Sequence, residues 1–287
     1  MKALLGYFLL VGATLAAFAG TTIDAVNRYA YGANIGWLDC YADQTNGAVI
    51  GAYVCSGYIY SANVGWINLG SGSPTNGIYY QNLSASDFGV NQDGLGNLRG
   101  YAYGANIGWI NFESMGAPKI NLTNGLMSGY VWSANCGWIS LSNGYAQVQT
   151  DTLFAGVTAP DGLPIAWLLA NFGTTNVSAS ADPTGKGVTI AQDYIAGTNP
   201  NLTNSVLRIA GGAFSPGGTS VSLTWETVPT RFYYIQTATS LTAVWTDSGL
   251  GLIVPSAGAT TTASFTAFNA SARFYRIETT QPLLFGL

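Results

Sequence analysis

Four near-copies of one nine-residue motif occupy the first half of this 287-residue chain. They read Tyr29-Ala-Tyr-Gly-Ala-Asn-Ile-Gly-Trp37, Tyr58-Ile-Tyr-Ser-Ala-Asn-Val-Gly-Trp66, Tyr101-Ala-Tyr-Gly-Ala-Asn-Ile-Gly-Trp109 and Tyr130-Val-Trp-Ser-Ala-Asn-Cys-Gly-Trp138. The final tryptophans stand 29, 43 and 29 residues apart, so the first pair of copies maps onto the second with an offset of 72 residues. Such regular self-similarity indicates a repeat domain built from a duplicated pair of units.

Each copy predicts a β-hairpin. In the third copy an aromatic-rich strand, Tyr101-Ala-Tyr, leads into the turn at residues 104–108, and a second strand, Trp109-Ile-Asn-Phe112, leads out. Asn tolerates a left-handed backbone and can bond its own backbone, and the flanking Gly supplies a positive φ, so we expect both to hold the turn. Strand alternation places Trp109 and Asn111 on one face, and Ile110 on the other. Residues 24–150 are therefore expected to form an all-β repeat domain.

Composition narrows the classes of function. Only 8% of residues are charged, the net charge is −4, and the nine basic residues are scattered singly. No basic patch exists to collect phosphates, which argues against a nucleic-acid partner.

The N-terminus has the pattern of a secretory signal peptide over residues 1–19. Lys2 is followed by the apolar run 4–17 and by the small-x-small sequence Ala17-Phe18-Ala19. An uncleaved membrane anchor is the alternative interpretation. No later segment approaches the ~20 apolar residues of a membrane span. We expect a secreted protein, located outside the cell or on the cell surface of a bacterium, with no membrane span after signal cleavage.

The second half of the chain has a different organisation. Residues 151–204 predict a small connector with short helices within 161–173 and 189–196, which end at Gly173 and Gly197. Residues 205–280 predict a seven-stranded β-sandwich, with strands at 206–209, 220–225, 232–237, 243–245, 250–254, 260–265 and 273–277. Residues 281–287 form a short apolar tail. The fold class expected for the whole chain is all-β.

Three parts of the chain resemble known families. Residues 100–110 and 129–139, with looser copies at 29 and 57, resemble secreted bacterial proteins that carry GYAWSENIGWI-like motifs. Residues 161–167 and 182–200 resemble an EF-hand or thrombospondin type 3-like calcium-loop connector, "DGDGLPDAWE…DPDGDGLTNLQEYLAGTDP". The last domain, with Arg273-Phe-Tyr-Arg276, resembles a fibronectin type III-like sandwich ending in "RFYR". The repeat resemblance implies no particular activity.

The calcium resemblance implies a metal site that the residues only partly supply. An EF-hand loop needs oxygen ligands at positions 1, 3 and 5, a Gly at 6 and an acid at 12. Asp182, Gly187 and Asp193 hold positions 1, 6 and 12, but Lys186 fills position 5, where an ammonium repels a cation. We therefore expect no cofactor, with Ca2+ at Asp182 and Asp193 as the alternative and a helix pair kept for packing as the favoured interpretation.

Few residues suggest catalysis. The chain contains no histidine, which removes Ser-His-Asp and Cys-His arrangements and imidazole zinc sites. A carboxylate pair for glycoside hydrolysis remains conceivable, with Asp39 and Glu113 as candidates because they follow motif tryptophans at positions where the other copies have no acid. Cys40 and Cys55 could form a disulfide in an oxidising compartment. Cys136 replaces Ile or Val and is expected to be a buried core residue.

The aromatic residues of the motif have two interpretations. They could form platforms on which sugar rings stack, or they could fill the core while the motif asparagines hold the turns. Identity across all four copies favours the core, because a structural role recurs in every repeat. The candidate ligand-binding residues are Trp37, Trp66, Trp109, Trp132, Trp138, Tyr31, Tyr60 and Tyr103.

The sequence favours a secreted, non-catalytic protein whose repeat domain binds a glycan or another cell-surface component, with the C-terminal sandwich as a spacer or attachment module. One alternative is self-association, in which unpaired edge strands assemble copies into a surface layer or filament. A second alternative is a carboxylate-based glycan-cleaving enzyme.

Overall fold

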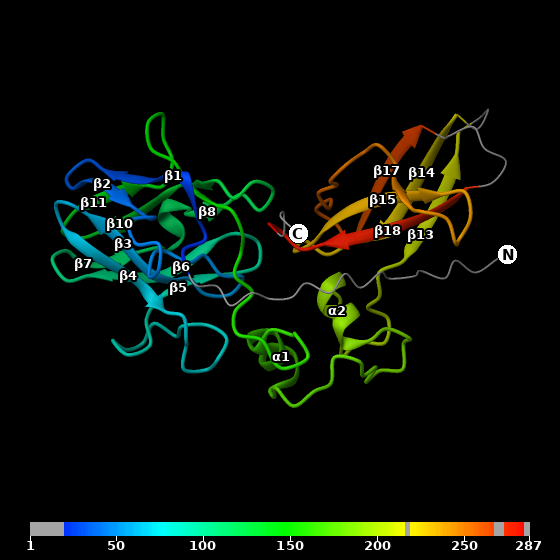
Figure 1. Ribbon diagram of the computed structural model, residues 1–287, viewed down its shortest axis with the longest axis horizontal. Helices are drawn as coiled ribbons and strands as arrows, with labels where there is room; N and C mark the ends of the chain where they lie inside the picture. Colours follow the sequence, from blue (N-terminus) through cyan, green and yellow to red (C-terminus); the bar gives the residue numbers. More distant parts are fainter. Residues whose placement is uncertain (1–19, 216–218, 267–272, 284–287) are drawn as a thin grey trace. The chain divides into compact units, whose positions relative to one another are not determined.

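The computed structural model describes residues 20–215, 219–266 and 273–283, and it is all-β, as the sequence predicts (Figure 1). The chain divides into two compact units between Val177 and Ser178. The division falls inside the segment predicted as a connector, so its two helices belong to different units. The expected signal peptide and most of the tail lie outside the described residues.

The N-terminal unit is built on a closed sheet. Each motif copy forms one antiparallel hairpin: β1 (Ile23–Gly32) with β2 (Gly36–Asp39), β3 (Ser56–Ser61) with β4 (Gly65–Ser71), β6 (Leu98–Gly104) with β7 (Gly108–Asn111), and β10 (Tyr130–Ser133) with β11 (Gly137–Ser140). Successive hairpins pair through β2–β3, β4–β6 and β7–β10, and β11 returns to β1. The closure leaves none of these eight strands with an unpaired edge.

Short strands, a 3-10 turn and α1 complete the described part of this unit. β5 (Val90–Gln92) pairs with β6, β12 (Val148–Thr150) with β1, and β8 (Lys119–Ile120) with β9 (Met127–Ser128). A single 3-10 turn covers Ser114–Gly116, and α1 (Ile165–Phe172) begins after Pro164. α1 ends at Gly173, which has the positive φ of 68° that favours Gly at a helix C-terminus.

A cycle of side-chain hydrogen bonds joins the four hairpin turns. The Nδ2 atoms of Asn34, Asn63, Asn106 and Asn135 donate to the carbonyl oxygens of Cys136 (3.0 Å), Ile35 (2.9 Å), Val64 (3.1 Å) and Ile107 (3.0 Å), respectively. Each motif Asn therefore bonds the turn of the neighbouring hairpin, and the fourth bond closes the ring. This corrects the expectation that each Asn holds its own turn in a left-handed conformation, because the positive φ falls on the motif Gly instead.

The residue between Asn and Gly points into the closed sheet. Ile35, Val64, Ile107 and Cys136 are all less than a tenth exposed, which confirms the expectation that Cys136 is a core residue. The size of each of these side chains depends on which residue lies three positions before it. The two Ile copies have Gly32 and Gly104, whereas the Val and Cys copies have Ser61 and Ser133. A Cβ on Gly32 would lie 2.8 Å from Cγ1 of Ile35, so an Ile at position 35 requires a Gly at position 32.

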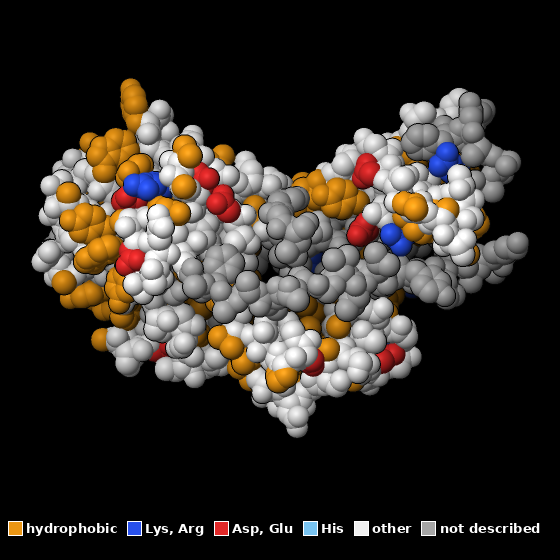
Figure 2. Space-filling view, in the orientation of Figure 1, with side chains coloured by type: hydrophobic (Ala, Val, Ile, Leu, Met, Phe, Trp, Pro, Cys, Tyr) orange, Lys and Arg blue, Asp and Glu red, His pale blue; other side chains and the backbone are white. Residues whose placement is uncertain are grey.

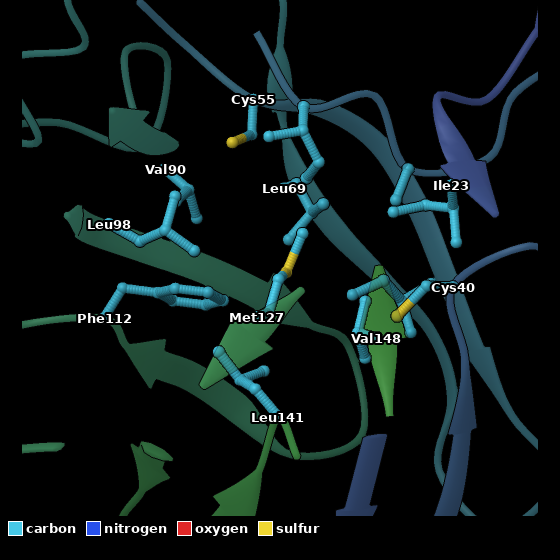
Figure 3. Close-up of a pocket in the computed structure, with 13 residues that line it drawn as sticks. Ile23, Cys40, Cys55, Leu69, Val90, Leu98, Phe112, Met127, Leu141 and Val148 are labelled. Carbon is cyan, nitrogen blue, oxygen red and sulfur yellow. The ribbon is translucent and has the colours of Figure 1, made fainter. Parts of the chain in front are cut away.

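The opposite side of the core is formed by the residue three positions after each motif tryptophan. Cys40, Leu69, Phe112 and Leu141 are all buried there and line a small apolar void of about 30 Å³ (Figure 3). Cys40 thus occupies the position that the other copies fill with Leu or Phe.

The expected disulfide between Cys40 and Cys55 is not formed. All three cysteines are free and buried. Figure 3 shows Cys55 and Cys40 in different parts of the void lining. Burial raises the pKa of both thiols to about 12. The two cysteines act as small apolar core residues.

The C-terminal unit contains two three-stranded sheets around one apolar cluster. One sheet has the order β13 (Ile209–Phe214), β14 (Ser220–Glu226), β17 (Thr260–Thr266), and the other β16 (Thr246–Asp247), β15 (Phe232–Ala238), β18 (Phe274–Thr280). Trp225, Tyr233 and Ile235 are fully buried between them. α2 (Ile190–Ala196) begins with a capping box of Thr189 and Gln192.

Three of the seven expected strands differ from the structure. The first, expected at 206–209, lies at 209–214 because an edge strand tolerates Gly211 and Gly212, which sequence propensity assigns to a turn. The strand expected at 243–245 is the two-residue β16. The one expected at 250–254 is reduced to a single bridge between Ile253 and Tyr233.

The size matching in the turns gives a stability prediction. We expect Gly32→Ser to lower the free energy of unfolding by about 1–3 kcal/mol, because the new Cβ overpacks against Ile35. Ile35→Val alone should cost about 0.5–1.5 kcal/mol. The double variant reproduces the Ser–Val pair of the second copy. Its loss in the free energy of unfolding, measured by urea denaturation, should therefore be smaller than the sum of the two single losses by at least ~0.5 kcal/mol. Simple additivity would contradict size matching.

Candidate functional site

Twelve aromatic side chains cover the outer face of the closed sheet. We call them the aromatic belt: Tyr29, Tyr31, Trp37, Tyr58, Tyr60, Trp66, Tyr101, Tyr103, Trp109, Tyr130, Trp132 and Trp138. Figure 2 shows hydrophobic side chains gathered over the part of the N-terminal unit where β2, β3, β4, β7 and β10 are labelled in Figure 1. All eight candidate residues from the sequence belong to this belt.

The belt overturns the preference for a core role. The four motif tryptophans are 45–49% exposed, and their cross-strand partners Tyr31, Tyr60, Tyr103 and Trp132 are 37–42% exposed. Strand alternation explains this arrangement, because the aliphatic residue after each tryptophan faces inward. Leu38, Ile67, Ile110 and Ile139 are nearly fully buried. The aliphatic residue after every motif Trp was the sequence signal that could have placed the tryptophans on the outer face.

Neighbouring tyrosines hold each tryptophan ring in a defined orientation. Ring centroids of Tyr31 and Trp37 lie 5.2 Å apart at an interplanar angle of 65°, and the same pair in the third copy lies 4.9 Å apart at 61°. A second tyrosine contacts the same tryptophan from further along the strand, as Tyr101 contacts Trp109 at 6.2 Å. Such edge-to-face pairs are favourable beyond their burial. The exposed rings are therefore preorganised.

Polar side chains lie in the seams between hairpins. The sheet register places Asp39 opposite Tyr60, Asn68 opposite Tyr103, Asn111 opposite Trp132 and Ser140 opposite Tyr31. The Oδ1 atoms of Asn68 and Asn111 accept backbone N–H groups two residues further on, at 2.8 and 2.5 Å. Their amide groups can still donate beside an aromatic ring. The seams at Asn68 and Asn111 thus combine an aromatic ring with an amide donor, whereas Asp39 is paired with Arg28 and Ser140 is buried.

At one position of the aromatic belt, a loop from outside the repeat packs against the motif tryptophan. The loop after β4 brings Phe88 against Trp109, with centroids 5.1 Å apart and rings nearly perpendicular at 83°. Between this loop and the third hairpin lies an open hollow of about 410 Å³, lined by Asn82, Leu83, Ser84, Ala85, Phe88, Tyr101 and Trp109. Phe88 and this hollow were not anticipated from the sequence, because nothing local to Phe88 indicates which hairpin it contacts.

Buried polar contacts order the hollow's loop. Asp87 is buried and accepts the backbone N–H and hydroxyl of Thr75 and the backbone N–H of Gln81, at 2.9–3.1 Å. The N–H donors of Thr75 and Gln81 hold the pKa of this carboxyl below its usual value. The Tyr80 ring packs so closely on Gly89 that a Cβ there would lie 2.2 Å from it. The loop therefore has one defined path.

The two carboxylates named as catalytic candidates are not brought together. In the sheet order β3, β4 and β6 lie between the strand of Asp39 and the strand that precedes Glu113. The two strands are four steps apart among the eight strands of the closed sheet, so they lie on opposite sides of it, which does not suit a glycosidase pair. Asp39 pairs with Arg28 at 2.9 Å, and Glu113 accepts the N–H of Gly100 at 3.1 Å. Both carboxylates have structural partners.

The ammonium group of a lysine occupies the place of a metal ion in the degenerate calcium loop. Lys186 Nζ lies 2.9 Å from Oδ1 of Asp193 and donates to the carbonyl oxygens of Asn199, Leu202 and Ser205 at 2.8, 3.3 and 2.9 Å. Its side chain is only 2% exposed. Asp182 accepts backbone N–H groups of its own loop instead. Carboxylate and carbonyl oxygens are the ligands of Ca2+, but here they surround an ammonium, so these residues do not fit the metal.

In comparisons with protein-family models, curated proteins and solved structures, none matched this chain. Among its described residues, no helix has the length and apolar character needed to cross a membrane.

The lysine arrangement predicts a metal-independent loop. We expect Lys186→Met to lower the stability of the C-terminal unit by about 3–5 kcal/mol, because it leaves the Asp193 carboxylate buried without a counter-charge. Lys119→Met, at an exposed lysine, is the matched control. Thermal unfolding of the wild type should be the same with Ca2+ and with EDTA. A lower melting temperature in EDTA would contradict the assignment.

Proposed function

We propose that this chain is a secreted, non-catalytic carbohydrate-binding protein of the bacterial cell surface or extracellular space. The aromatic belt would stack on the apolar faces of sugar rings, and the C-terminal, fibronectin type III-like unit would serve as a spacer or attachment module. The exposure of all four motif tryptophans, each held by tyrosine neighbours, carries the proposal.

The energetics of the belt support a binding role. Exposed aromatic rings in ordered positions offer contact area at a small cost in conformational entropy, because the ring orientation exists before the ligand arrives. Twelve outward-facing aromatic side chains on one sheet far exceed the scattered single hydrophobic residues of an ordinary surface. The amide groups of Asn68 and Asn111 in the seams supply hydrogen-bond donors for hydroxyl groups.

The charge of the N-terminal unit indicates which glycans suit it. Residues 20–177 contain eight acidic and three basic residues, and the guanidinium of Arg28 is paired with Asp39. An anionic polysaccharide would meet an excess of like charge. Neutral glycans are therefore the favoured ligand class.

A belt variant tests the proposal. We expect the wild-type chain to be retarded in native gels that contain neutral polysaccharides such as xylan, galactomannan or mixed-linkage β-glucan. Replacing Trp37, Trp66, Trp109 and Trp138 by Ala should abolish the retardation, because the stacking surface is lost. Tyr145→Ala removes a fully exposed aromatic outside the belt and should leave binding unchanged. Migration unaffected by every neutral polysaccharide would refute carbohydrate binding.

One observation favours self-association as a second candidate function. β13 is an edge strand, its residues 210–214 are exposed, and it carries no charged side chain. Its sequence, Ile209-Ala-Gly-Gly-Ala-Phe214, is nearly symmetric about its centre. Two copies related by a two-fold axis could pair antiparallel with Gly212 of one copy opposite Gly212 of the other, because the axis places the central residue opposite its own copy. Such pairing would join two C-terminal units.

The edge strand gives its own prediction. We expect the wild-type chain to show a concentration-dependent dimer in light scattering, and Ala213→Lys to be monomeric, because it places like charges across the two-fold axis. Thr239→Lys, at an exposed loop position, is the charge-matched control. A wild-type chain that stays monomeric at every concentration would exclude this interface.

A further inference from the structure

The third hairpin differs from the other three in the surroundings of its tryptophan. Trp109 contacts three other rings, those of Tyr101, Tyr103 and Phe88, and Phe88 reaches it from the loop after β4. Phe88 also contacts Tyr103 at 6.3 Å. Within the described residues, the hollow between this loop and the hairpin gives Trp109 a concave setting on a closed sheet that is otherwise convex.

Concavity matters because a convex surface touches a ligand from one side only. The hollow of about 410 Å³ lies within the ~300–1,000 Å³ range of small-molecule sites. Its lining combines the rings of Trp109, Tyr101 and Phe88 with the polar groups of Asn82 and Ser84. A few convergent polar groups beside apolar walls are the general composition of a ligand site.

The loop that forms the outer wall is held in place before any ligand binds. Asn82 adopts a left-handed backbone with φ of 56°, and its Oδ1 accepts the N–H of Gly89 at 3.0 Å. The N–H of Asn82 donates to the carbonyl oxygen of Asp87, also at 3.0 Å. Leu83 at the rim is 89% exposed, although its side chain is apolar. A preorganised wall lowers the entropy that binding must overcome.

The lining also excludes a charged ligand. None of the seven lining residues is ionisable as an acid or a cation, apart from the phenol of Tyr101. Asp87 lies next to Phe88 in the chain, but both of its carboxylate oxygens accept hydrogen bonds from the loop. An anionic sugar would find no counter-charge, and a cationic one no exposed carboxylate in the lining.

We propose that this hollow is the principal binding site of the protein and that it takes one segment of a neutral glycan, with a pyranose ring stacked on Trp109 and Phe88 closing its edge. The inference rests on the proposed function and adds to it a single dominant site among four similar hairpins. The other three tryptophans then provide weaker, auxiliary contacts.

Titration calorimetry on the full chain tests the site, with cellohexaose, xylohexaose and mannohexaose as probes and trigalacturonic acid as the charged comparison. We expect a neutral probe to bind with a stoichiometry of one. Trp109→Ala and Phe88→Ala should each weaken binding at least tenfold, and Phe88→Ala does so without altering the closed sheet. Trp37→Ala and Trp66→Ala, at equivalent positions without a wall, should weaken binding by a smaller factor. Tyr145→Ala, outside the aromatic belt, is the control and should leave the affinity unchanged.

The outcomes separate the two proposals. Equal losses from the three tryptophan variants, or a stoichiometry near four, would overturn the single-site inference and leave carbohydrate binding intact. Tight binding of trigalacturonic acid would overturn the assignment of a neutral ligand. If no probe binds the wild-type chain, the inference fails together with the proposed function. Circular dichroism spectra of each variant show whether a loss of binding reflects a loss of fold.

Discussion

The four hydrogen bonds between neighbouring turns are the constraint on which the rest of the N-terminal unit depends. Each motif Asn bonds the carbonyl group of the hairpin beside it, and the fourth bond returns to the first hairpin. A cycle of this kind sets the stagger between hairpins, because shifting one of them would break the bonds on both of its sides. A slip by one residue would also exchange the two faces of a strand, so the cycle keeps the aliphatic residues inside and the aromatic ones outside.

Once the stagger is set, the same short motif produces two surfaces with different chemistry. The inner surface is aliphatic and tightly matched in size, as the Gly32–Ile35 and Ser61–Val64 pairs show. The outer surface carries preorganised tryptophan and tyrosine rings beside seam residues such as Asn68 and Asn111. Where a loop from outside the repeat covers part of this surface, at Phe88 and Trp109, a convex row of rings becomes a concave site. Under the proposed function, binding capacity would be a property of the scaffold, and selectivity a property of the loop.

Much of the fold could be predicted from local patterns. The four hairpins, the alternation that separates Trp109 from Ile110 and the helix ends at Gly173 and Gly197 all follow from turn chemistry and from the period of a strand. The interpretation of the repeated tryptophans as core residues was wrong, because repetition says that a role recurs without saying on which face. The edge strand containing Gly211 and Gly212 was misplaced for a related reason: glycine propensity describes an average strand, and an edge strand departs from that average.

The sequence by itself determined the all-β class, the hairpins and the residues that could occupy a site. Only the tertiary structure decided what those residues do, because each decision depends on a partner far along the chain. Asn34 finds its acceptor at Cys136, Lys186 takes the place of a cation among the carbonyl groups of 199–205, and Cys40 fills the apolar position that its sister copies give to Leu or Phe. Trp109 is distinguished from the other motif tryptophans only by its contact with Phe88, which the sequence alone does not show. Local propensities cannot specify these pairings, since they are set by closure of the sheet.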